Sequence, residues 1–192
     1  MRVYLVRHAS HALLGRVLCG RVEDIGLDAN GYQQASALAA HFADLNIDLV
    51  QSSARRRARE TAQPIAERLH CSLEIVPALD EHDAGAWSGR NFETLAADPC
   101  WHNWNARRGS NRPPGGESMR ELQQRIVEHL DRLRGGDANN TVLVSHAEPI
   151  RSALMHYRGI ALDDFHEVEV EPASISVLDL KPPRIELSMA VA

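Results

Sequence analysis

The sequence predicts a three-layer α/β/α sandwich built around a mainly parallel β-sheet. Short β-prone apolar runs alternate with amphipathic segments at helical spacing, which is typical of a parallel sheet covered by helices on both faces. Two of these runs, at residues 3–6 and 141–144, end abruptly at the titratable pairs Arg7-His8 and Ser145-His146. Ligands bind just beyond the carboxyl ends of the strands in such a sheet. We therefore expect the two histidines to face each other across a single anion.

The composition is that of an ordinary globular protein without a general affinity for polyanions. The 192 residues are 44% hydrophobic and 24% charged, which predicts a single domain over residues 1–192 with a sizeable core. The formal net charge of -5 argues against nucleic acid or anionic membranes as partners. Any anion must therefore be bound locally.

Neither the amino terminus nor the cysteines carry a targeting or ligand motif. The first apolar run is interrupted at Arg7, too early for a signal peptide, and no stretch approaches membrane-spanning length. Cys19, Cys71 and Cys100 lack the paired spacing of zinc or redox motifs and are expected to be free thiols. These features predict a cytoplasmic protein and leave its oligomeric state open.

Strands and helices alternate through the first half of the chain. After a loop at residues 9–28, a helix is expected over residues 31–45, where apolar side chains recur at helical spacing. A strand at residues 47–51 leads into a basic helix that ends near His70, and the next strand covers residues 73–76. A Gly- and Trp-bearing turn follows at residues 85–89.

The second half begins with a segment that has no periodicity. Residues 99–116 are rich in Trp, Arg, Asn, Pro and Gly, and they are interpreted as a long irregular insertion. Ser118 and Glu121 form a capping-box pattern that starts a helix, followed by a strand at 141–144 and a short helix at 149–157. Two β-prone runs, at 174–180 and 185–189, are candidates for edge pairing.

His8 is a candidate nucleophile. The cation of the adjacent Arg7 penalises the protonated ring and favours neutral imidazole. One ring nitrogen could then attack phosphorus while the other donates a hydrogen bond to a backbone carbonyl. A histidine that merely caps a buried strand is the alternative, and the presence of Arg7 and His146 favours the catalytic interpretation.

His146 is expected at the amino terminus of a helix. Residues 145–148, Ser-His-Ala-Glu, have the capping-box pattern, and Pro149 suits the first helical turn. Free backbone N–H groups and the helix dipole make such a position an anion site. The alternative is a cap with an incidental histidine inside it.

The proposed attack on phosphorus also requires a second phosphate-binding arginine and an acid. Most of the basic stretch is expected to be a solvated helix face, but one arginine could turn inward to form a clamp with Arg7. The spacing does not say which of Arg55, Arg56, Arg57 and Arg59 it is. A carboxylic acid is needed to protonate a leaving group. The candidates are Asp80, Glu81, Asp83 and Glu148.

Five segments in the same order resemble motifs of the histidine phosphatase superfamily, which includes cofactor-dependent phosphoglycerate mutases and many small phosphatases. Residues 5–9, Leu-Val-Arg-His-Ala, are similar to the Arg-His-Gly signature of the family. Residues 52–62 are similar to its Ser-Ser-Pro-Leu-x-Arg-Ala-x-Gln-Thr-Ala stretch. Residues 79–89, 115–118 and 144–146 correspond to the remaining motifs.

The resemblance implies a phosphoglycerate mutase-like fold and a covalent mechanism. His8 would attack phosphorus and form a phosphohistidine, and Glu81 would act first as acid and then as base. The non-bridging oxygens would be held by four residues: Arg7, Arg57, His146 and Ala147. No metal or cofactor is implied.

These observations favour a metal-independent phosphomonoester hydrolase acting on a small phosphorylated metabolite. Ser10, His11 and Leu14 stand where mutases contact substrate, which disfavours mutase activity. Ala9 and Ala147 replace glycines that usually follow the two histidines, and they are the sequence support for a non-catalytic phosphate-binding module. A zinc site on His8 and His11 is disfavoured by the cation of Arg7.

The substrate is left open by the sequence. We expect the pocket to include Ser10, Leu14, Gly20 and Trp104. The tryptophans and arginines of the insertion could contact a heterocycle or a further phosphate, or they could simply pack on the domain. α-Ribazole phosphate, sugar phosphates, 3-phosphoglycerate and a phosphohistidine on another protein are all compatible with these residues.

Overall fold

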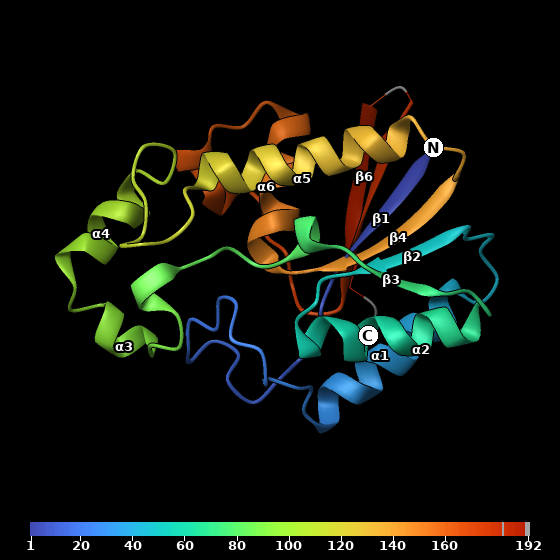
Figure 1. Cartoon of the computed structure of the whole chain (residues 1–192), viewed down its shortest axis with the longest axis horizontal. Coiled ribbons are helices and arrows are strands. Elements are labelled where there is room, and N and C mark those ends of the chain that lie inside the picture. The colour runs from blue at the N-terminus through green and yellow to red at the C-terminus, as the bar shows by residue number, and fades with distance from the viewer. Residues whose placement is uncertain (182, 191–192) are drawn as a thin grey trace.

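One six-stranded sheet runs through the molecule in the order β3-β2-β4-β1-β5-β6 (Figure 1). The computed structural model describes residues 1–181 and 183–190. The first four strands, β1 to β4, are all parallel to one another. Strand β5 is antiparallel to both of its neighbours, β1 and β6. The strands are β1 Arg2–Arg7, β2 Leu49–Ser52, β3 Leu73–Ile75, β4 Asn140–Ser145, β5 Ser174–Leu180 and β6 Pro183–Ala190. The predicted α/β fold is confirmed, with a mixed sheet whose last strands are the expected β-prone runs.

Two pairs of helices cover opposite faces of the sheet (Figure 1). Strand alternation explains this, because Tyr4 and Val6 pack into the cluster formed with one pair, while Val3 and Leu5 pack into the cluster formed with the other. The first pair is α1 Ala29–Phe42 and α2 Arg56–Arg68; the second is α5 Met119–Arg134 and α6 Ala147–Arg158. The predicted three layers are therefore present.

The helix starts follow local capping. Asp28 accepts a hydrogen bond from the Gly31 amide, so α1 begins at Ala29, two residues earlier than predicted. The Ser118 and Glu121 side chains form the expected capping box of α5. The predicted box at Ser145 is wrong: the Ser145 hydroxyl donates to the carbonyl of Leu79 instead, and α6 begins after His146.

The segment at residues 99–116 is only partly irregular, which corrects the sequence interpretation. Pro99–Ala106 forms helix α4, and the Asp98 carboxylate accepts a hydrogen bond from the Cys100 amide at its start. An Asp-Pro pair at a helix start was the available signal. The short helix α3 Phe92–Leu95 precedes α4. Elsewhere in the chain, 3-10 turns occur at Pro77–Leu79, Gly85–Trp87 and Leu162–Glu167.

A third hydrophobic cluster attaches α4 to the rest of the fold. It lies apart from the two clusters beside the sheet and is formed by Ala84, Trp87, Leu95, Trp104, Met119 and Leu122.

Within the described residues, no helix combines the length and the apolar character needed to cross a lipid bilayer.

Replacing Ser118 with alanine is expected to destabilise the fold modestly. The change removes the hydroxyl that caps α5 and should cost about 1 kcal/mol, or about 2 to 4 °C in Tm for a chain of this size. Thermal unfolding by circular dichroism measures the effect. Ser36→Ala, on the exposed face of α1, is the control that should leave Tm in place. Equal melting of both variants would show that the cap contributes nothing.

Candidate active site

Three parallel strands deliver polar residues to the same edge of the sheet. Arg7 is in register with Ser145, and the amide of His8 donates to the Ser145 carbonyl at 2.9 Å. The rings of His8 and His146 consequently lie with their centroids 5.1 Å apart. The amide of Ser53, just past β2, donates to the Val144 carbonyl at 3.0 Å, so it joins them. The structure thus brings the two predicted histidines together.

His8 has a defined tautomer. Its Nδ1 lies 2.9 Å from the carbonyl oxygen of Ala9, which can only accept a hydrogen bond, so Nδ1 carries the proton. The Nε2 atom then presents a lone pair and accepts from Nε of Arg57 at 3.3 Å. Burial, with the charges of Arg57 and Arg7, holds the pKa of His8 well below its usual range. His8 is therefore a neutral imidazole with Nε2 available as a nucleophile.

Arg57 is the member of the basic stretch that turns inward. It is 1% exposed, and its Nη2 donates to the Gly20 carbonyl at 2.8 Å. Gly20 has a φ of +49°, a conformation that a glycine adopts without strain. Arg56 and Arg59 are exposed, as expected for a helix face. Arg55 departs from that expectation, because it is half-buried and forms an ion pair with Asp80.

Arg7, the last residue of β1, is held by the segment that precedes β5. Its Nη1 donates to the carbonyl oxygen of Val170 at 2.6 Å. Burial lowers its pKa, and the nearby Glu81 counteracts part of that effect. Because backbone carbonyls orient Arg7 and Arg57 without neutralising them, both guanidinium groups keep their positive charge for a ligand.

The surroundings of the four acid candidates distinguish Glu81 from the others. Asp80 is buried and accepts hydrogen bonds from Ser53 and Arg55, and Asp83 accepts from the Gly85 amide. Burial and the charge of Glu148 raise the pKa of Glu81, although its bond from the His82 amide and the two site arginines oppose this. Glu81 is the candidate that can hold a proton.

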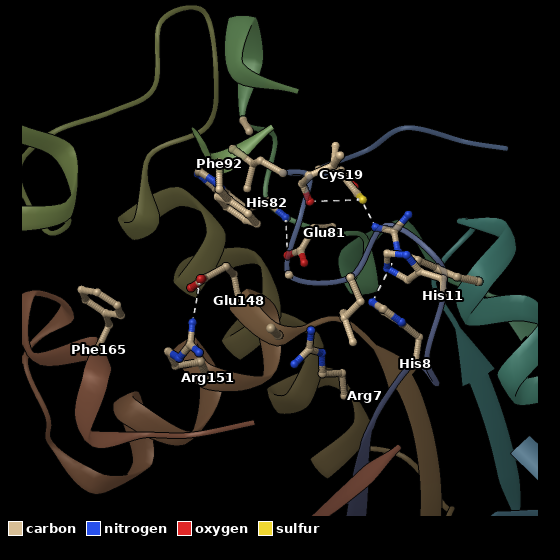
Figure 2. Close-up of a pocket in the computed structure, with 18 of the residues that line it drawn as sticks. Arg7, His8, His11, Cys19, Glu81, His82, Phe92, Glu148, Arg151 and Phe165 are labelled. Carbon is tan, nitrogen blue, oxygen red and sulfur yellow. Dashed lines mark hydrogen bonds and ion pairs between the residues drawn. The ribbon is translucent and has the colours of Figure 1, made fainter. Parts of the chain in front are cut away.

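Glu148 is ionised, in contrast to Glu81. Burial would favour its neutral form, but Arg108 and Arg151 outweigh this effect and lower its pKa to about 2. Its Oε1 accepts from Nη1 of Arg108 at 3.0 Å and from Nη1 of Arg151 at 2.6 Å. Glu148 and Arg151 point toward each other, and Figure 2 shows this pair on the side of the pocket away from His8. Glu148 is thus a fixed anion and no proton donor.

These groups line one cavity of about 310 Å³. Of the residues predicted for phosphate and substrate, Arg7, His8, Leu14, Gly20, Arg57, Glu81, Trp104 and Ala147 line it. His146 is not part of this lining; it is fully buried, with its ring directly beside that of His8. Ser10 is not part of the lining, because its hydroxyl donates to Asp28 at the start of α1.

Several lining residues were not predicted for the pocket. They include His82, Phe92, Arg151 and Phe165, whereas Arg108 is one of the insertion arginines expected to contact a ligand. The guanidinium of Arg108 lies 4.2 Å from the centroid of Trp104 and 3.5 Å from that of Phe165. Trp104 therefore both packs in the third cluster and contributes to the pocket. No group of three or more His, Cys, Asp or Glu side chains suited to a metal ion occurs within the described residues.

A family model decides which proteins this chain is related to. Residues 3–191 match the model of the histidine phosphatase superfamily, branch 1. The chain belongs to the histidine phosphatase superfamily. One curated relative is a putative phosphoserine phosphatase 2 from Hydrogenobacter thermophilus, which is 28% identical over 94% of this chain and 90% of the relative. Another is a probable phosphoglycerate mutase from Erwinia tasmaniensis, which is 30% identical over 93% of this chain and 85% of the relative.

Solved structures share the histidine phosphatase fold. A putative alpha-ribazole-5'-P phosphatase from Escherichia coli superposes with a TM-score of 0.89 at 23% identity, covering 100% of this chain and 97% of the other. A phosphoserine phosphatase from Entamoeba histolytica, in complex with 3-phosphoglyceric acid, gives 0.83 at 24% identity, covering 97% and 95%. The resemblance found in the sequence is confirmed at the level of family and fold.

The charge of Arg57 should be measurable in the titration of His8. Replacing Arg57 with methionine removes a cation that disfavours the imidazolium, so the pKa of His8 should rise. Nitrogen-detected NMR of the ring measures both the pKa and the Nδ1–H tautomer. Arg59→Met, on the exposed face of the same helix, is the matched control. An unchanged His8 titration in Arg57→Met would contradict the coupling.

Proposed function

We propose that this chain is a phosphomonoesterase that hydrolyses a small phosphorylated metabolite through a phosphohistidine at His8. The observation that carries the proposal is the unprotonated Nε2 of His8, which accepts a hydrogen bond from Arg57 at the wall of a cavity that Arg7 also lines. A buried neutral imidazole beside two guanidinium groups that make no ion pair within the described residues suits an electrophile that brings its own negative charge.

In the first step, Nε2 of His8 attacks phosphorus in line with the ester oxygen. The N–P bond forms as the P–O bond breaks, and the Glu81 carboxyl gives its proton to the departing alkoxide. Arg7 and Arg57 hold the non-bridging oxygens, and their charges stabilise the transferring phosphoryl group. The raised pKa of Glu81 is what keeps the required proton available.

In the second step, water takes the place of the leaving group. The Glu81 carboxylate now accepts a proton from this water as its oxygen attacks phosphorus. The N–P bond breaks, inorganic phosphate leaves, and both His8 and Glu81 return to their starting protonation states. The same carboxyl group serves both steps because the water enters from the side that the leaving group vacates.

The relatives support the proposal at the level of chemistry. The curated names include phosphoserine phosphatase and phosphoglycerate mutase, and the solved structures include an alpha-ribazole-5'-P phosphatase and a mycobacterial glucosyl-3-phosphoglycerate phosphatase. Each name specifies a phosphate ester of a small molecule. We infer hydrolysis as the reaction and leave phosphotransfer between two substrates as the alternative outcome of product analysis.

Replacing His8 with alanine should abolish hydrolysis of para-nitrophenyl phosphate measured in the presence of EDTA. Loss of the nucleophile is expected to lower kcat at least about a thousandfold. His41→Ala, an exposed histidine on α1, should retain full activity. Activity that survives in His8→Ala, or that disappears with EDTA, would overturn the mechanism. Label from heavy-oxygen water should appear in the phosphate, whereas transfer to a second substrate indicates a mutase.

Replacing Glu81 with glutamine should separate leaving groups by their need for a proton. Formation of the phosphohistidine from an alkyl phosphate should fall at least about a hundredfold, but from para-nitrophenyl phosphate less than about tenfold, because nitrophenolate leaves without protonation. Rapid-quench measurement of the first turnover reads this step.

In the unmodified protein, alkyl phosphate turnover should also decline as the pH rises through the raised pKa of Glu81. An equal loss for both esters would contradict the role of Glu81 as acid.

A further inference from the structure

Ser53 and Asp80 belong to the family-like segments but take no part in the chemistry proposed above. Both are buried at the edge of the sheet, directly behind His146. Nε2 of His146 lies 2.8 Å from Oγ of Ser53, and that oxygen lies 2.6 Å from Oδ1 of Asp80. The three side chains form a continuous hydrogen-bonded row leading away from the phosphate site.

The direction of these hydrogen bonds is determined by Asp80. Its Oδ1 also accepts from the Ala54 amide at 3.1 Å, and its Oδ2 accepts from Nη2 of Arg55 at 3.2 Å. A carboxylate used in this way is an acceptor only, so the single hydroxyl proton of Ser53 points to Asp80. The Ser53 oxygen must then accept from its other neighbours, the Arg55 amide at 3.2 Å and Nε2–H of His146.

This direction fixes the tautomer of His146 opposite to that of His8. With its proton on Nε2, neutral His146 carries a lone pair on Nδ1, and Nδ1 is buried without a hydrogen-bond partner among the described residues. A lone pair facing a phosphoryl oxygen is repulsive. Nδ1 can donate to that oxygen only if the ring takes up a second proton.

The charged groups around His146 show when this proton is taken up. Burial lowers the pKa of His146, and the charges of Arg57, His8, Arg7 and Arg125 act in the same direction. Asp80 faces the ring through Ser53. A bound dianion would cancel the field of Arg7 and Arg57 at the ring and favour the imidazolium.

We propose that Ser53 and Asp80 are positioning residues that hold His146 in its Nε2–H tautomer, so that the site must take up one proton from solvent in order to bind a phosphoryl dianion. This inference rests on the proposed function and adds to it the contact between His146 and the phosphoryl group that the family resemblance implies. It makes Ser53 and Asp80 determinants of the pH range over which the site binds its ligand.

The test is the number of protons taken up when the full-length protein binds tungstate, a dianion with the shape of phosphate. Calorimetry in buffers of different ionisation enthalpy gives this number near neutral pH. In Ser53→Ala, a neutral His146 can move its proton to Nδ1 and donate without protonation. In Asp80→Ala, the Ser53 hydroxyl loses its acceptor and is free to turn and donate to Nε2. Both variants should therefore take up one proton fewer than the unmodified protein, and Ser36→Ala should match the unmodified protein.

A purely structural role predicts a different result. It would weaken tungstate binding in Ser53→Ala and Asp80→Ala without changing the number of protons, and this outcome overturns the proposal. Nitrogen-detected NMR of His146 in the unmodified protein gives an independent answer that needs neither a variant nor a ligand: Nε2–H is expected, and Nδ1–H overturns the proposal. Hydrolysis that depends on His8, together with an unchanged proton number, would leave the proposed function in place and reject this inference alone.

Discussion

The parallel pairing of β1 with β4 is the interaction on which the site depends, because it places Arg7 opposite Ser145 and so brings the next residue of each strand together. His8 and His146 meet at the point where hydrogen bonding between the strands ends, with the His8 amide donating to the Ser145 carbonyl. Removal of both rings from water then keeps them neutral. A single strand pairing thus sets the position and the protonation of the two histidines.

The arginines of this fold are balanced in two different ways. Arg55 and Arg108 are paired with carboxylates, Asp80 and Glu148, and their charge is largely neutralised. Arg7 and Arg57 are held by backbone carbonyls instead, which orient a guanidinium without cancelling its charge. A buried cation without an ion pair is costly, and a bound anion would relieve this cost at Arg7 and Arg57.

Sequence reasoning located the strands and the histidines because both are local features. The apolar runs that end at His8 and His146 can be recognised without any other part of the chain. The choice of Arg57 among four arginines depended on a family resemblance, since helical spacing alone left it open. The contact of Arg108 with Glu148 joins positions 40 residues apart and leaves no periodic trace. Helix α4 was missed because its eight residues are too few for a helical period to show in the sequence.

The separate hydrophobic cluster around Trp104 has a consequence for how the pocket can diverge. The clusters beside the sheet hold the nucleophile and its arginines in place, whereas the wall formed by α4 is anchored by packing of its own. Local stability of this kind allows one part of a fold to loosen or be rebuilt while the rest stays cooperative. Substitutions in α4 can therefore change which leaving group the pocket accepts, while the residues around His8 stay the same.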